Sequence, residues 1–114
     1  MQEAIRGETF TVDASADEAM VALRGTLRLN GTDEYAQIAA LLRDTCKLAK
    51  PVVLDLRELE FLNSSGIAML SRFVIDARDI GASLTIRGAR RIAWQGKSLV
   101  NLQRLMPALA LDLA

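Results

Sequence analysis

The sequence predicts an α/β fold: one mixed β-sheet with helices packed mainly on one of its faces. Some segments have apolar residues at every second position, which is typical of strands. They are interspersed with segments whose apolar residues recur every three or four positions, which is typical of helices. The first two strand-like segments are joined by a short connection, which favours an antiparallel pair. Each later strand is separated from the next by a helix, which favours parallel crossovers. The expected order is β-β-α-β-α-β-α-β.

The antiparallel pair stands at the start of this order. Residues 8–14 alternate, with Phe10 and Val12 on one face, and residues 20–29 follow after a polar turn. Gly25 lies in the middle of the second segment. A glycine at such a place indicates a bulge or the close approach of another backbone.

Three helices with clear starts or stops are expected after this pair. The first begins near Thr32 and runs to about residue 48, with a core stripe of Ile38, Leu41, Leu42 and Thr45. The second begins at a pair of serines and is closed by Gly81. The third covers residues 95–106 and stops at Pro107. The strands between and after the helices are expected over residues 52–56, 83–87 and 109–113.

The composition excludes several classes of protein. Of the 114 residues 51% are apolar and 25% are charged, with 14 acidic and 14 basic side chains, so there is no net charge to attract nucleic acid or an anionic membrane. No apolar run approaches the roughly 20 residues that span a bilayer. The start of the chain lacks the pattern of a signal peptide. We therefore expect a single domain over residues 1–114, cytoplasmic, with no nucleic-acid partner and no direct membrane insertion.

Residues that carry common catalytic chemistry are scarce. There is no histidine, which removes Ser-His-Asp and Cys-His nucleophiles and the usual zinc sites. The single cysteine, Cys46, lies at the edge of the first helix's stripe and is expected to be a half-buried structural residue. The segment Gly96-Lys97-Ser98 lacks the glycine that a phosphate-binding loop needs at position 91, so a helix start is the better interpretation. We expect no catalytic residue, no metal and no cofactor.

The most informative stretch is Asn63-Ser64-Ser65-Gly66, between a strand and the second helix. As pure structure, Asn63 or a serine caps the helix by accepting a backbone N–H. The same geometry suits a phosphate, because a helix N-terminus presents free amides and the positive end of a dipole. Asp55 interrupts the apolar run of the preceding strand. It either accepts hydrogen bonds from a loop at the edge of the sheet or helps to line this site.

A second face of the same helix is a candidate partner surface. At 100° per residue, two small residues and one isoleucine align under Ser64, away from the core, and two charged residues flank them. These positions are Ala68, Ser71 and Ile75, with Arg72 and Asp79 beside them. The alternative is a few scattered apolar residues on a solvated surface, which is common.

Two segments resemble the STAS domain, and within it the free-standing anti-sigma factor antagonists of bacteria. They are Val-Leu-Asp-Leu at residues 53–56 and Phe-Leu-Asn-Ser-Ser-Gly-Ile-Ala-Met-Leu at residues 61–70. The typical family motif is a strand with Leu-Asp-Leu, followed by Asp-Ser-Ser/Thr-Gly at the opening of a helix. The resemblance covers essentially the whole chain, because the strand pair, the element order and the length also suit a STAS-type sheet. Where the family has Asp, this chain has Asn63, which keeps the cap and removes a negative charge.

The resemblance implies a regulatory binding module without catalysis of its own. A partner serine kinase that is also an anti-sigma factor would bind the unmodified domain and so release a sigma factor. It would phosphorylate the first serine of the pair, here Ser64, and a PP2C-type phosphatase would restore it. The alternative is a non-phosphorylated STAS subunit of a lipid-transport or sensory complex. A small enzyme or nucleotide-binding protein is the third possibility, against which the missing histidine and the incomplete phosphate loop argue.

Overall fold

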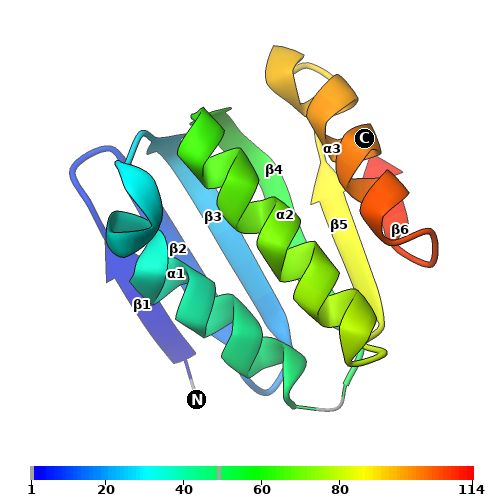
Figure 1. The fold of residues 1–114 in the computed structure, drawn as a ribbon. Helices are drawn as coiled ribbons and strands as arrows, with labels where there is room; N and C mark the ends of the chain where they lie inside the picture. Colours follow the sequence, from blue (N-terminus) through cyan, green and yellow to red (C-terminus); the bar gives the residue numbers. More distant parts are fainter. Residues whose placement is uncertain (1, 49) are drawn as a thin grey trace.

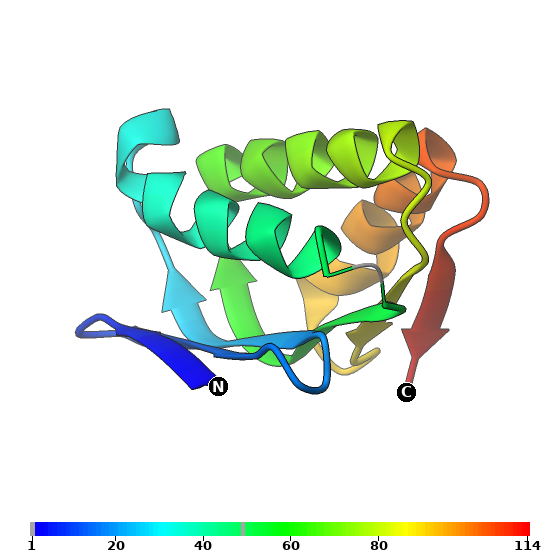
Figure 2. The same ribbon diagram turned by 90° about the horizontal axis from the view of Figure 1, so that it is seen from below.

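The computed structural model describes residues 2–48 and 50–114, which form a six-stranded sheet with three helices on one of its faces (Figures 1 and 2). The elements, in chain order, are β1 (Gln2–Arg6), β2 (Phe10–Ser15), β3 (Met20–Leu27), α1 (Gly31–Cys46), β4 (Val52–Leu62), α2 (Ser64–Asp79), β5 (Leu84–Gly88), α3 (Ala93–Leu105) and β6 (Ala110–Leu113). The α/β class, the mixed sheet and the placement of the helices are confirmed.

The strands lie side by side in the same order as in the sequence. β1, β2 and β3 are antiparallel neighbours, and β3 to β6 are parallel neighbours. Each parallel connection passes through one helix, and right-handed crossovers that advance in one direction place all their helices on the same face. Figure 1 shows α2 as the middle helix, with α1 over one side of the sheet and α3 over the other.

Two differences from the expected elements concern strands. The order is β-β-β-α-β-α-β-α-β, because β1 pairs with β2 in an edge position that the sequence pattern did not predict. Ile5, opposite Val12, packs against the core, whereas the side chains described over residues 3, 4 and 6 are exposed, so the alternation was too weak to detect. β4 was expected to end at residue 56 and instead continues to Leu62.

The second half of β4 is completed by side chains of α3. Its pairing with β5 ends at Asp55, which leaves the later carbonyl groups of this edge without a strand partner. Gln95, fully buried, donates to the carbonyl oxygens of Leu56 at 2.6 Å and Leu59 at 3.1 Å, and Trp94 Nε1 also donates to Leu59 at 3.1 Å. Buried carbonyl groups need such partners. Trp94 and Gln95 belong to the first turn of α3. The helix begins at Ala93, earlier than expected, so the segment 96–98 lies inside it rather than at its start.

The core lies between the helices and one face of the sheet. Fully buried leucines from β3, β4 and α2 meet residues of α1 and α3 there, including Leu23, Leu54, Leu70, Ile38 and Leu99. Along the described part of the chain, no helix has both the length and the apolar character that crossing a membrane requires. Cys46 is 7% exposed at the end of α1, and burial raises the pKa of its thiol to about 11.

The buried state of Cys46 predicts a slow reaction with thiol reagents. Only the thiolate is nucleophilic, and a pKa of about 11 leaves almost none of it at neutral pH. Native protein should resist iodoacetamide, whereas protein unfolded in guanidinium chloride should be labelled quickly at the same pH. Mass spectrometry measures the labelled fraction over time. Equal labelling rates in the two states would contradict the structural role of this cysteine.

Candidate functional site

Asn63 caps helix α2, as the sequence predicts. It follows β4 in an extended conformation, with φ −79° and ψ 176°, and its Oδ1 accepts the backbone N–H of Gly66 at 3.0 Å. This bond satisfies one of the free amides at the start of the helix. The backbone N–H of Asn63 itself donates to the carbonyl oxygen of Leu27 at 3.2 Å, which continues the pairing between β3 and β4.

The same asparagine joins α2 to α1 and to the end of β3. The hydroxyl of Tyr35, a residue of α1 that is 1% exposed, donates to Asn63 Oδ1 at 2.7 Å. Asn63 Nδ2 donates to the carbonyl oxygen of Leu29 at 2.7 Å. Burial raises the pKa of Tyr35, so its hydroxyl stays protonated and remains a donor. The side chain of Asn63 thus acts as acceptor twice and as donor once.

We call the contacts of the Asn63 side chain with α1, α2 and the end of β3 the Asn63 junction. Gly66 allows α2 to approach the other segments closely at this junction. A Cβ atom at this position would collide with the side chain of Leu62 and would lie 2.7 Å from the hydroxyl of Tyr35. Any larger residue would push α2 away from the two groups that hold it. The glycine of the motif is therefore required by packing, whereas its φ angle is an ordinary one.

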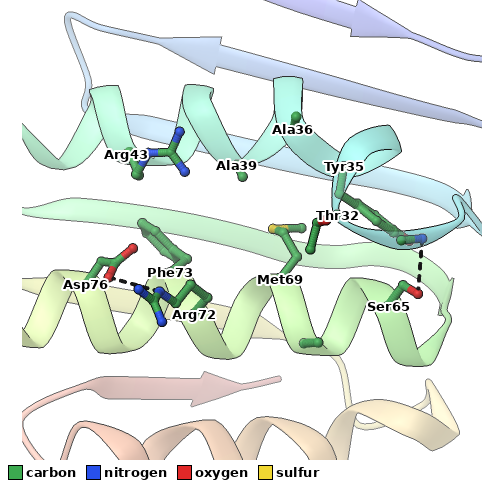
Figure 3. A pocket seen from close by; sticks show the side chains of 12 residues that line it. Thr32, Tyr35, Ala36, Ala39, Arg43, Ser65, Met69, Arg72, Phe73 and Asp76 are labelled. Carbon is green, nitrogen blue, oxygen red and sulfur yellow. Dashed lines mark hydrogen bonds and ion pairs between the residues drawn. The ribbon is translucent and has the colours of Figure 1, made fainter.

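The two serines of the motif point in different directions. Ser64, the first residue of α2, is exposed. Ser65 is half-buried and faces α1, where its Oγ accepts the N–H of Gly31 over a long distance of 3.4 Å (Figure 3). Ser64 is therefore accessible from solvent in the folded protein. The hydroxyl of Ser65, in contrast, lies in the contact between α1 and α2 and is less accessible.

The expected partner surface forms a ridge along the outer side of α2, the middle helix in Figure 1. Its members are Ser64, Ala68, Ser71, Arg72, Ile75 and Asp79, and all are exposed or half-buried. The hydroxyl of Ser71 donates to the carbonyl oxygen of Ile67 at 2.9 Å, so it is occupied within the helix. Arg72 forms a loose ion pair with Asp76 at 3.5 Å and is otherwise open to solvent. We call this surface the α2 ridge.

A groove between α1 and α2 lies beside this ridge, and the sequence pattern did not reveal it. It encloses about 350 Å³ and is lined by Ala36 and Ala39 of α1 on one wall and by Ala68 of α2 on the other, above a floor of Met69 and Phe73. Figure 3 shows Met69 and Phe73 between the two helices. Ser65 and Gly31 lie at one end, and Arg43, Arg72 and Asp76 at the other. The small residues Ala36 and Ala39, three positions apart on α1, were a weak signal, because their neighbours on α2 are known only from the packing of the two helices.

Asp55 was expected beside Ser64 or under a loop, and the structure places it at neither position. It lies in the first half of β4, opposite Ala22 and Arg87, and its neighbours in the strand, Leu54 and Leu56, face the helices. Its carboxylate therefore lies on the uncovered face of the sheet. There Arg57 donates to its Oδ1 and Oδ2 at 3.0 and 2.8 Å. These hydrogen bonds lower the pKa of Asp55, against the opposing effect of burial.

The Asp55–Arg57 pair predicts a pH-dependent contribution to stability. Because the folded-state pKa of Asp55 is lowered, the stabilisation is present above the unfolded-state pKa of about 4 and is lost as the pH falls through the folded-state value. Asp55→Asn should lower the melting temperature at pH 7, and the difference from the wild-type protein should shrink below about pH 4. Thermal unfolding followed by circular dichroism measures both. A difference that is the same at all pH values would contradict the ionic origin of the effect.

The Asn63 junction predicts a large loss of stability in Asn63→Ala. This change removes three hydrogen bonds, and we expect the free energy of unfolding to fall by about 2–3 kcal/mol. Tyr35→Phe removes one of these bonds and should cost about 1 kcal/mol. Urea denaturation measures both, with the exposed Asn101 of α3 changed to Ala as the matched control. If Asn63→Ala were no less stable than the control, the junction would not hold α2.

Comparisons with known proteins agree with this geometry. Residues 10–111 match the protein family described as "Mlab, STAS domain". No curated protein matches the chain. SiaC of Pseudomonas aeruginosa is 17% identical, with a TM-score of 0.72 over 100% of this chain and 96% of that one. Apo-SiaC from the same organism is 16% identical, with a TM-score of 0.75 over 99% and 98%.

A third similar structure is a complex. It is that of the diguanylate cyclase SiaD with its activator SiaC from Pseudomonas aeruginosa, in which the matching chain is 17% identical, with a TM-score of 0.75 over 98% of this chain and 99% of that one. At such identities these structures establish similarity of fold. The family match covers most of the chain, including the Asn63 junction and all of α2. The chain therefore belongs to the STAS-domain family.

Proposed function

We propose that this chain is a non-catalytic regulatory module, which binds a partner protein through the α2 ridge and is switched off by phosphorylation of Ser64. The observation that carries the proposal is the position of Ser64. It is exposed, it is the first residue of a helix whose start is capped by Asn63, and it is the member of the α2 ridge at that end. A modification at this hydroxyl changes the charge of the surface without disturbing the buried junction below it.

A phosphate suits the place chemically. The first turn of α2 holds no acidic residue, and the free amides and dipole of a helix N-terminus stabilise an anion. The phosphate would add a charge of about −1.5 to −2 to the edge of the ridge at neutral pH. A partner that fits the unmodified ridge would then have to desolvate this charge or meet it with a like charge. Either effect weakens binding.

The expected partners follow from the resemblance to anti-sigma factor antagonists. They are a serine kinase that is also an anti-sigma factor, and a PP2C-type phosphatase that removes the phosphate. The complex of SiaC with the cyclase that it activates supports the broader part of the proposal, since that protein of the same fold acts by contact with another protein. In this proposal the chain needs no cofactor and no metal.

A second candidate function is a STAS subunit that is not phosphorylated and serves a lipid-transport or sensory complex. The observation in its favour is Asn63, which replaces the family's Asp at the residue before Ser64. A kinase that reads the carboxylate of that Asp would not find it here, because the amide of Asn63 is turned inward to Leu29 and Gly66. In this case the α2 ridge would serve as a permanent interface.

Phosphorylation and binding of co-purified partners test the switch. We expect phosphate on Ser64 in protein isolated from its native host, and at least tenfold weaker partner binding by Ser64→Asp, or about 1.4 kcal/mol. Ile75→Glu, within the ridge, should weaken binding as well. Mass spectrometry locates the phosphate, and isothermal titration calorimetry measures affinity. Ser83→Asp is the control, because Ser83 is exposed at the opposite end of the sheet.

The outcomes separate the two functions. Unchanged affinity of Ser64→Asp for every partner would refute the electrostatic switch. Loss of binding in Ile75→Glu together with an unmodified Ser64 would favour the permanent interface. Equal effects of Ser64→Asp and Ser83→Asp would show that added charge acts through the whole molecule rather than through the ridge.

A further inference from the structure

We propose that the groove between α1 and α2 binds an amphipathic helix of the partner protein, with an acidic side chain of that helix held by Arg43 and Arg72. The proposal rests on the proposed function, since it names the chemistry of the partner segment. It adds α1 to an interface that the sequence assigned to α2 alone.

The shape of the groove suits a large apolar side chain from a partner. Its walls are alanines, Ala36 and Ala39 on α1 and Ala68 on α2, and small residues in facing walls leave room for a large side chain from outside. Its floor, Met69 and Phe73, is apolar and already buried to more than nine-tenths. A leucine or phenylalanine inserted here would remove apolar surface from water on three sides.

The length of the groove suits a partner helix. A further cavity of about 230 Å³ continues it past Arg43, Phe73 and Asp76 as far as Ile80, which is 61% exposed. The depression therefore follows α1 along the whole of its 16 residues, or about 24 Å at 1.5 Å per residue. An occupant of this length that offers an apolar side chain at every turn has the form of a helix laid in a groove.

Charge determines what the helix must carry. Arg43 and Arg72 lie at the same end of the groove with one carboxylate, Asp76, between them (Figure 3). Arg72 holds Asp76 only loosely, at 3.5 Å, and the side chain of Arg43 has no hydrogen bond or ion pair with any residue that the structure describes. This end is therefore positive on balance. A glutamate or aspartate of the occupant would pair with Arg43, and Arg offers a fork that fits a carboxylate.

The spacing along α1 gives the pattern of the partner helix. Arg43 follows Ala39 by about 6 Å and Ala36 by about 10 Å along the helix axis, at 1.5 Å per residue. The acidic residue should therefore stand four or seven positions from the large apolar residue that enters between the alanines. Both intervals return to the same face of a helix.

A helix fits the groove better than a fatty acyl chain. Ala36 and Ala68 are exposed, so the groove is open to water along its outer side. An acyl chain in it would remain half in water, whereas an amphipathic helix covers the groove with its apolar face and presents a polar face outward. A carboxylate is common to both occupants, and the test has to separate them.

Display selection with a library of amphipathic helical peptides tests the proposal. The peptides carry fixed apolar positions on one face and random residues at the charged positions, and the bait is the full chain. Enriched peptides should carry Asp or Glu four or seven positions from a large apolar residue. Fluorescence anisotropy then measures their affinity for variants of the protein. Absence of enriched peptides, or enrichment without the acidic position, would overturn the proposal.

Matched variants locate the binding site. Ala36→Phe fills the groove and should weaken peptide binding at least tenfold, whereas Gln37→Phe, exposed on the same helix, should not. Arg43→Glu should weaken it similarly, and a peptide with Lys in place of its acidic residue should restore binding to this variant. Arg104→Glu on α3 is the charge control. Equal losses in a variant and its control would place the peptide elsewhere.

Further arms distinguish other occupants and the parent proposal. If dodecanoate binds to the protein by itself and also displaces the peptide, the proposal of a helical occupant is refuted, and the groove is a site for a fatty acid. A dimer in sedimentation experiments that Ala36→Phe dissociates would show a second copy of this chain in the groove. If a co-purified partner loses affinity for Ser64→Asp and none for Ala36→Phe, the groove is refuted and the switch stands. The reverse result refutes the switch and retains the groove.

Discussion

The side chain of Asn63 joins three segments that come from different parts of the sequence. It holds the first turn of α2, the hydroxyl of Tyr35 on α1 and the backbone that follows β3, with all of its hydrogen-bonding partners at 3.0 Å or less. Gly66 and Leu62 pack tightly around this point. The exposed serine, the ridge on α2 and the groove beside it all take their positions from this junction.

The motif of the anti-sigma factor antagonists that this chain resembles has Asp where this chain has Asn63, and the asparagine has a physical role here. An asparagine can donate to the carbonyl oxygen of Leu29, which an ionised carboxylate cannot do. Compared with an aspartate, Asn63 therefore lacks a negative charge and gains a hydrogen bond that connects the start of α2 with the end of β3. The cap survives the exchange, because Oδ1 still accepts from Gly66. What changes is the electrostatic field around Ser64, to which a modifying enzyme or a phosphate would respond.

The two serines connect the surface with the groove. Ser64 faces solvent at the end of the α2 ridge, and Ser65 faces α1 at the end of the groove. Ala68 and Arg72 belong to both features. A partner that lies in the groove would therefore also cover part of the ridge, so that a phosphate at Ser64 would stand at the margin of the occupied surface. The proposed switch and the proposed groove use one continuous region of the molecule.

Local sequence determined the fold class, most of the elements and the chemistry of the motif. The periods of the apolar residues distinguish strands from helices, and the Asn-Ser-Ser-Gly stretch marks a capped helix, because these properties depend on residues close together in the chain. Asp55, the extension of β4 and the edge strand β1 could not be placed in this way. Their positions depend on partners such as Arg57, Gln95 and β2, some of them close in the chain and some distant. The groove was decided only by the tertiary structure, since its walls are alanines about 30 residues apart that become a site when α1 packs against α2.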